Sequence, residues 1–264
     1  MNVYYFEVKS LARSCFIWTA SIVMVFYSFL LFVYPIFEDG IAIMEVMFAN
    51  MPAEFMQAFG LEVSSLLNYS GFYAFAFLYY SLMGAIMATH LSLTAFAREK
   101  ANQCEEFLFV KPMNRSRLFW AKLASVATCV LFCSVCYFLS SIHGFAEHGG
   151  LSQMGVLVSI SLGLQQIIFL CIGMLVGVCK QKIRFISGLA ATIGFSAFLV
   201  QTIVNLFEED MFTYLSPFHY FAPSLVLEQN GYGVGYMVIA LCMVLGSILF
   251  SYQRYTNADI AMGK

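Results

Sequence analysis

Six long segments of the chain contain no Asp, Glu, Lys or Arg, and they constrain the fold more than any other feature of the sequence. Each has the length that a helix needs to cross the hydrocarbon layer of a bilayer, which is about 30 Å thick. The segments are Cys15–Phe37, Ser70–Ala95, Leu123–Ile142, Met154–Cys179, Phe185–Phe207 and Tyr236–Gln253. With 61% hydrophobic and 11% charged residues, the chain has too little polar surface for a soluble globule of 264 residues. We therefore predict an all-α membrane protein whose six transmembrane helices form a single domain over residues 1–264.

The basic residues lie on one side of the membrane once these six spans are drawn. All thirteen Lys and Arg residues fall before the first span, after the last, or in the connections between spans two and three and between spans four and five. Cytoplasmic loops carry an excess of Lys and Arg, so this side is predicted to be cytoplasmic. We expect a multi-pass protein of the cell membrane, such as a bacterial inner or plasma membrane, with both termini in the cytoplasm.

Three segments outside the spans have the amphipathic or aromatic pattern of structure at a membrane surface. Met1–Arg13 places aromatic residues against charged ones, which predicts an amphipathic elbow helix at the inner surface. Glu38–Tyr69 predicts two short interfacial helices on the outer side. Phe207–Gly235 is aromatic and ends in closely spaced glycines, so we expect it to re-enter the membrane and pack against the bundle.

The inner connection between spans two and three contains acidic and apolar residues that suit contact with a soluble partner. Residues 99–110 are predicted to form a helix that Pro112 ends, and Asn114 is positioned to cap the next helix. Basic residues that include Arg115 and Lys122 would then meet anionic lipid or a partner before span three begins. Two interpretations are open from the residues alone: a docking helix that inserts into a cleft on another protein, and an ordinary basic inner loop.

Three stretches of the chain resemble the membrane subunits of six-span, type-2 ATP-binding-cassette (ABC) exporters. They are M-P-A-E-F-M-Q-A-F-G-L (Met51–Leu61), A-R-E-K-A-N-Q-C-E-E-F-L-F-V-K-P-M-N-R-S-R-L-F-W-A-K-L (Ala97–Leu123) and L-S-P-F-H-Y-F (Leu215–Phe221). The second stretch is similar to the family's E-x-x-x-G-T-x-E-x-L-L-x-x-P-x-x-R segment, which forms a coupling helix on the ATPase. Glu106 is the matching acid, and Pro112 and Arg115 are the matching stop and base, although Gln103 and Cys104 stand where the family has Gly-Thr.

The resemblance implies a permease that takes its energy from another protein. The residues that it places against the ATPase are Glu99, Glu105, Glu106, Phe107, Leu108, Lys111, Pro112 and Arg115. The sequence has no G-x-x-x-x-G-K-[ST] phosphate loop, so we expect no enzyme activity or cofactor in this chain. ATP and Mg would be bound by two copies of a cytoplasmic ABC ATPase. A second permease copy or a paralogue would complete the unit within the membrane lipids.

The implied activity is export of a lipophilic or amphipathic substrate, such as a drug, an antimicrobial peptide or a lipid. The alternatives are an ion-coupled secondary transporter and a non-transporting membrane scaffold. Ion-coupled carriers usually place ionisable groups at membrane depth, and the six spans contain no acid or base apart from His90, near the inner end of span two. A nucleic-acid partner has no support in the charge distribution.

Four amide side chains at membrane depth are candidates for the lining of a transport pathway. They are Gln165 and Gln166 in span four and Gln201 and Asn205 in span five. Amides at this depth face protein or water rather than lipid. Hydrogen bonding between helices is the interpretation that we favour, and the lining of a pathway is the alternative.

The eight cysteines are not arranged for disulfides or for a metal site. Seven of them lie within the spans or at their ends, and Cys104 lies in an inner loop, where thiols stay reduced. Cys129, Cys133 and Cys136 share a helix face by their spacing, which admits a soft metal ion in principle. We interpret them as small polarisable packing residues and expect no metal.

The orientation predicts which introduced cysteines a membrane-impermeant maleimide can reach in intact cells. Cysteines at Glu54 or Glu209 should label from outside, whereas those at Arg115 or Lys182 should label only after permeabilisation. The parent chain provides the background. External labelling at Lys182 would overturn the assignment of the spans.

Overall fold

The fold is a bundle of long helices. The computed structural model describes residues 3–40, 50–52, 56, 68–101, 114–150, 152–180, 183, 185–206 and 213–257, with the backbone alone at 38–39 and 99–101. Its main elements are α1 (Val3–Ser28), the π-helix η1 (Phe29–Val33), α2 (Tyr34–Asp39), α6 (Tyr69–Ala101), α8 (Arg115–Gly144), the π-helix η2 (Phe145–Gly149), α9 (Gln153–Cys179), α10 (Ile186–Leu206), α12 (Pro223–Glu228) and α13 (Val234–Thr256). These residues contain no strand, which confirms the all-α class.

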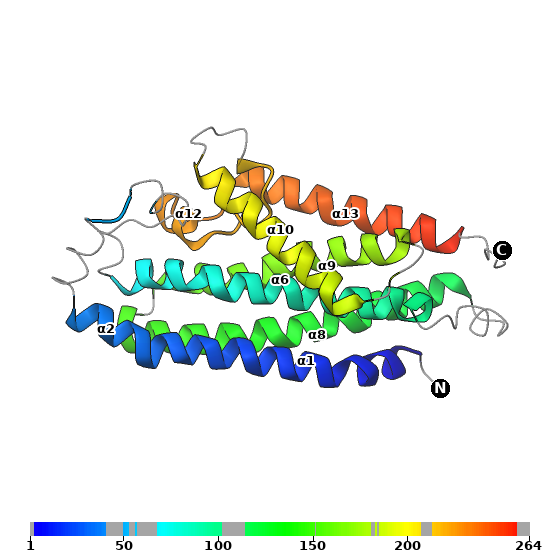
Figure 1. Cartoon of the computed structure of the whole chain (residues 1–264), viewed down its shortest axis with the longest axis horizontal. Coiled ribbons are helices and arrows are strands. Elements are labelled where there is room, and N and C mark those ends of the chain that lie inside the picture. Colours follow the sequence, from blue (N-terminus) through cyan, green and yellow to red (C-terminus); the bar gives the residue numbers. More distant parts are fainter. Residues whose placement is uncertain are drawn as a thin grey trace.

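Six of the helical stretches are long and apolar enough to cross a membrane, and each overlaps one predicted span. Figure 1 shows them side by side, with α10 crossing its neighbours obliquely. The start of α1 and the end of α13 lie at the same end of the bundle, as an even number of crossings requires. We call this end inner, following the prediction from the basic residues.

The first span differs from the prediction at its inner end. Residues Val3–Ser28 form one uninterrupted helix, so the separate elbow expected over Met1–Arg13 is not confirmed. The run Val3–Phe37 has 35 residues and is about 50 Å long at 1.5 Å per residue. This length exceeds the hydrocarbon layer, so α1 continues beyond the layer instead of bending along its surface.

The centre of the bundle is formed by α6 and α9. In the apolar stretches of these helices, 56% and 61% of the residues are buried, against 11% in α13. The two helices approach closely because α9 presents glycines to α6: a Cβ at Gly173 would lie 2.8 Å from the carbonyl oxygen of Thr89. Ser92 in turn donates a hydrogen bond to the carbonyl of Leu170 at 2.8 Å. Small residues and short hydrogen bonds of this kind hold helices together where lipid supplies no hydrophobic drive.

The outer half of the bundle is dominated by aromatic side chains from α1, α6 and α8. The rings of Phe26, Tyr73 and Tyr137 pack together, and the hydroxyls of Tyr73 and Tyr137 lie 2.6 Å apart. Ser141 donates to the Tyr73 hydroxyl at 2.9 Å and contacts Ser159 of α9. These contacts satisfy polar groups that would be costly to leave unpaired in an apolar interior.

The segment before the last span packs against the bundle, as its aromatic residues predict. Phe218 is buried with its ring 5.0 Å from that of Phe169 and 6.2 Å from that of Phe198, near the middles of α9 and α10. Helix α12 follows and also contacts α9. Most of the outer segment predicted to hold two interfacial helices, Glu38–Tyr69, lies outside the described residues.

Candidate functional site

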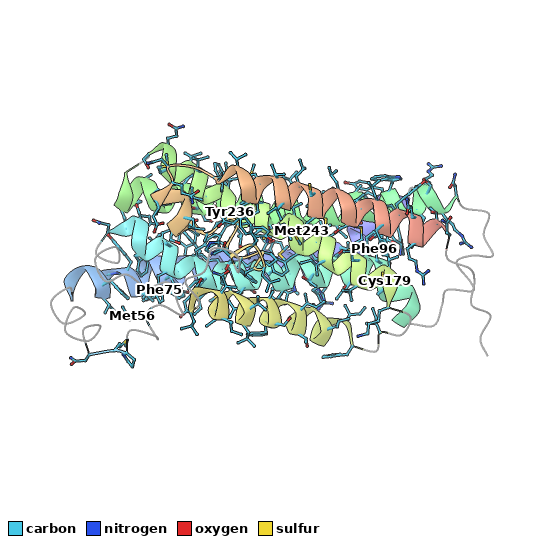
Figure 2. The ribbon with its side chains drawn as sticks, turned by 90° about the horizontal axis from the view of Figure 1, so that it is seen from above. Met56, Phe75, Phe96, Cys179, Tyr236 and Met243 are labelled. Carbon is cyan, nitrogen blue, oxygen red and sulfur yellow. The ribbon has the colours of Figure 1, made fainter. Side chains whose placement is uncertain are left out.

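The candidate docking segment follows α6 and precedes α8 in the chain, and both helices extend beyond the predicted spans at the inner end of the bundle (Figure 1). Helix α6 continues through Glu99 to Ala101, and α8 begins at Arg115. Phe96 and Cys179 mark the inner ends of α6 and α9 in Figure 2, and Phe75 marks the outer end of α6. Six of the residues predicted to contact an ATPase lie outside the described part of the chain: Glu105, Glu106, Phe107, Leu108, Lys111 and Pro112.

The start of α8 is fixed by its own cap and by the end of α13. The Asn114 side chain accepts a hydrogen bond from the backbone N–H of Ser116 at 3.0 Å, which confirms the predicted cap. The Arg115 guanidinium donates to the carbonyl of Thr256 at 3.3 Å. Thr256 is the last residue of α13, and a cation there is favoured by the helix dipole. Arg115 therefore joins two helices at the edge of the candidate site.

An ion pair that the sequence analysis did not predict joins α1 to the inner end of α6. The guanidinium of Arg98 lies 3.2 Å from the carboxylate of Glu7, and it also donates to the hydroxyl of Ser10. Glu7 is only 3% exposed. The pair joins residues 91 positions apart, so only the packing of α1 on α6 brings them together. The only sign of this pair in the sequence is an acid, Glu7, directly after the aromatic residues Tyr4, Tyr5 and Phe6.

The prediction that Lys122 meets lipid or a partner is wrong. Its side chain is fully buried, and its ammonium donates to the carbonyl of Ala95 in α6 at 2.6 Å. The reason is geometric: α8 begins at Arg115, so Lys122 lies two turns inside the helix, on the face that packs against α6. Buried cations need hydrogen-bond partners, and a backbone carbonyl supplies one here.

Gln166 connects three helices in the middle of the bundle. It is fully buried in α9, and its amide oxygen accepts a hydrogen bond from Ser134 of α8 at 2.9 Å. Its amide nitrogen lies 3.6 Å from the sulfur of Cys133 in α8 and 3.9 Å from that of Met87 in α6. These contacts favour the interpretation of Gln166 as a hydrogen-bonding residue between helices.

The other amides are less completely paired. Gln165 donates to the carbonyl of Ser81 at 3.4 Å, and Gln201 donates to Asn205 within α10 at 2.7 Å. The amide oxygens of Gln165 and Gln201 are buried without a hydrogen-bond partner in the part of the chain that the structure describes. Gln165 and Gln166 are adjacent in α9, whereas Gln201 and Asn205 lie one turn apart in α10.

His90 lies at the inner half of α6 between two serines from other helices. Its Nδ1 lies 3.5 Å from the Ser14 hydroxyl of α1, and its Nε2 lies 3.3 Å from the Ser187 hydroxyl of α10. Both ring nitrogens therefore have a polar neighbour. The arrangement joins α1, α6 and α10.

The outer segment holds polar groups of its own beside the bundle. The Tyr232 hydroxyl donates to the carbonyl of Leu157 in α9 at 2.7 Å, and burial raises its pKa. Burial lowers the pKa of His219, whose ring lies 5.5 Å from that of Tyr236. Both shifts favour the neutral form, which suits a segment packed against apolar helices.

Comparison with known proteins does not assign the chain to a family. A scan of the sequence against models of protein families finds no match, and no curated protein matches it. Across the described residues, no cluster of three potential metal ligands occurs, and the thiols of Cys129 and Cys133 are free and buried.

The contacts of Gln166 predict a larger structural role than those of Gln201. Gln166→Leu removes bonds to a neighbouring helix, each worth about 0.6 kcal/mol, and should lower the midpoint of thermal unfolding in detergent by about 2–4 °C. Gln201→Leu removes an unpaired buried oxygen and one bond within α10, so its midpoint should change less. A larger loss for Gln201→Leu would contradict these assignments.

Proposed function

We propose that this chain is the permease subunit of an ABC exporter, which moves a lipophilic or amphipathic compound with energy from a separate ATPase. The observation that carries the proposal is the inner segment Ala97–Leu123, whose acids, apolar residues, proline and arginine resemble a coupling helix. The segment connects two helices from the core of the bundle. A force applied there would reach the centre of the membrane domain directly.

The flanking structure supports a docking role for this segment. Helix α6 runs for 33 residues without a break, which is longer than a crossing needs, and ends at Ala101. Helix α8 begins with the Asn114 cap and the bond from Arg115 to α13. Of the proposed docking residues, Glu99 lies in the last turn of α6 and Arg115 is the first residue of α8.

The energy source in this proposal is a pair of cytoplasmic ABC ATPases that bind ATP and Mg. Closure of the ATPases on nucleotide would push on the docking segment of each permease. A second permease copy or a paralogue would stand across a central cavity. The chain itself takes part in no chemical step.

An ion-coupled carrier is the second candidate, and His90 is the observation that favours it. Its two nitrogens face hydroxyls from two other helices, as a proton-exchanging group could. Carriers of this kind usually place carboxylates at membrane depth as well. Glu7 pairs with Arg98 at the inner end, and the predicted spans hold no acid, so ATP-driven export is the better supported proposal.

The cargo is proposed to be apolar or amphipathic because the bundle offers it mainly apolar surfaces. Exposed side chains along α10 and α13 are large and aliphatic or aromatic, such as Phe195, Leu199, Leu241 and Leu249. Lipid, a second permease and an apolar cargo all suit such faces. The amides Gln165, Gln166, Gln201 and Asn205 would provide the few polar groups along the route.

Reversing one charge in the docking segment should uncouple the two subunits. We expect Glu106→Lys to insert normally and to lower the ATPase stimulation by a panel of peptides, lipids and hydrophobic drugs about tenfold, because it inverts an interfacial charge. Glu147→Lys makes the same charge change on an exposed residue at the opposite end of the bundle and is the matched control. A Glu106→Lys complex with its normal ATPase content and normal stimulated turnover would count against the proposal.

A further inference from the structure

The ion pair between Glu7 and Arg98 is not explained by membrane insertion or by docking alone. Glu7 is buried, whereas the Arg98 side chain is about one quarter exposed, and their charged atoms are 3.2 Å apart. Ser10, one turn further along α1, also accepts a hydrogen bond from Arg98. Burial of a carboxylate without a charged partner costs free energy, so displacement of α1 from α6 would destabilise the protein by leaving Glu7 unpaired.

The pair lies beyond the inner ends of the first two predicted spans. Helix α1 starts about 18 Å before the first apolar span, and Glu7 lies in this extension. Arg98 lies three residues from the end of α6 and directly precedes Glu99, the first of the proposed docking residues. Along α6, a displacement of the docking segment therefore reaches Arg98 before it reaches the apolar part of that helix.

Lys122 of α8 forms a second contact with the inner end of α6. The buried ammonium of Lys122 donates to the carbonyl of Ala95, which lies one turn before Arg98. The inner end of α6 is thus bonded to α1 through Arg98 and to α8 through Ala95. Both bonds involve a charged group, and charge-assisted hydrogen bonds are stronger than neutral ones.

The outer end of the first span contains a local change of helix type. Residues Phe29–Val33 form the π-helix η1 between α1 and α2. Single turns of π-helix interrupt the regular hydrogen-bond ladder, occur often at functional sites and are recognised positions of bending. Helix α1 therefore has a charged attachment at one end and a position suited to bending at the other.

We propose that Glu7 and Arg98 form a clamp through which α6 moves α1 when the docking segment is displaced. This inference rests on the proposed function and adds a positioning pair to it. The inner parts of α1 and α6 would move as one body, with η1 absorbing the change in direction. Ile36, in α2 beyond η1, would then change its surroundings at the outer end.

The test uses the purified permease with its native ATPase partner in lipid nanodiscs. A cysteine at Ile36, which is 59% exposed, is labelled with a water-soluble maleimide in the presence and absence of ATP, and the parent chain gives the background from native thiols. We expect ATP to change the labelling rate by about fivefold, a typical size of coupling between distant sites. Glu7→Gln should abolish this change and leave basal ATP hydrolysis intact.

Matched variants separate a clamp from general damage to α1. Exchange of the charges, Glu7→Arg with Arg98→Glu, should restore most of the ATP effect, because the attraction is rebuilt in the opposite sense. Lys9→Gln removes an exposed charge two residues away and should leave the effect unchanged. If Glu7→Gln does not assemble, Glu7→Asp, with a carboxylate about one methylene shorter, should give a reduced effect.

The outcomes distinguish the clamp from the function on which it rests. A purified complex without any ATPase activity would overturn the proposed function, and the clamp with it. A complex that hydrolyses ATP but shows no ATP effect at Ile36, or the same effect in Glu7→Gln as in the parent, would overturn the clamp alone. Failure of the charge exchange to restore the effect would also contradict it.

Discussion

Hydrocarbon offers no hydrogen-bond partners, and the whole arrangement of this chain depends on that constraint. Every backbone amide that crosses the membrane must be satisfied within its own segment, so the apolar segments are helices. Polar side chains at this depth must find partners in neighbouring helices. Ser92 bonds to the backbone of α9, and Gln166 bonds to Ser134 of α8. The polar groups of the spans therefore determine which helices lie together.

The two ends of the bundle meet the constraint in different ways. The outer half relies on aromatic rings in edge-to-face and tilted pairs, with a few buried hydroxyls such as those of Tyr73 and Tyr137. The inner end also contains packed rings, such as those of Phe96 and Phe119, and it adds charged groups: Arg98 meets Glu7, and Lys122 meets the carbonyl of Ala95. Hydrogen bonds that involve a charged group are stronger than neutral ones. We therefore expect the charged contacts at the inner end to transmit a directed force.

The sequence predicts the local features of this fold and misses the contacts between distant residues. The six spans follow from summed hydropathy, and the Asn114 cap follows from one side chain beside its own helix. The burial of Lys122 could not be predicted, because the residue looks like any base next to a span until the start of α8 and its facing helix are known. The pairing of Glu7 with Arg98 depends on how α1 packs against α6. The continuity of α1 was missed because an amphipathic start suits an elbow and a straight helix equally well.

The central claim is that ATP bound by another protein, and no ion gradient, drives movement of an apolar compound through this chain. The most direct measurement is uptake of fluorescent lipophilic probes by inverted membrane vesicles that contain the native complex, with ATP and a protonophore varied independently. ATP-driven export should give uptake that requires ATP and continues after the proton gradient has collapsed. Uptake that persists without ATP and stops with the gradient would instead indicate an ion-coupled carrier.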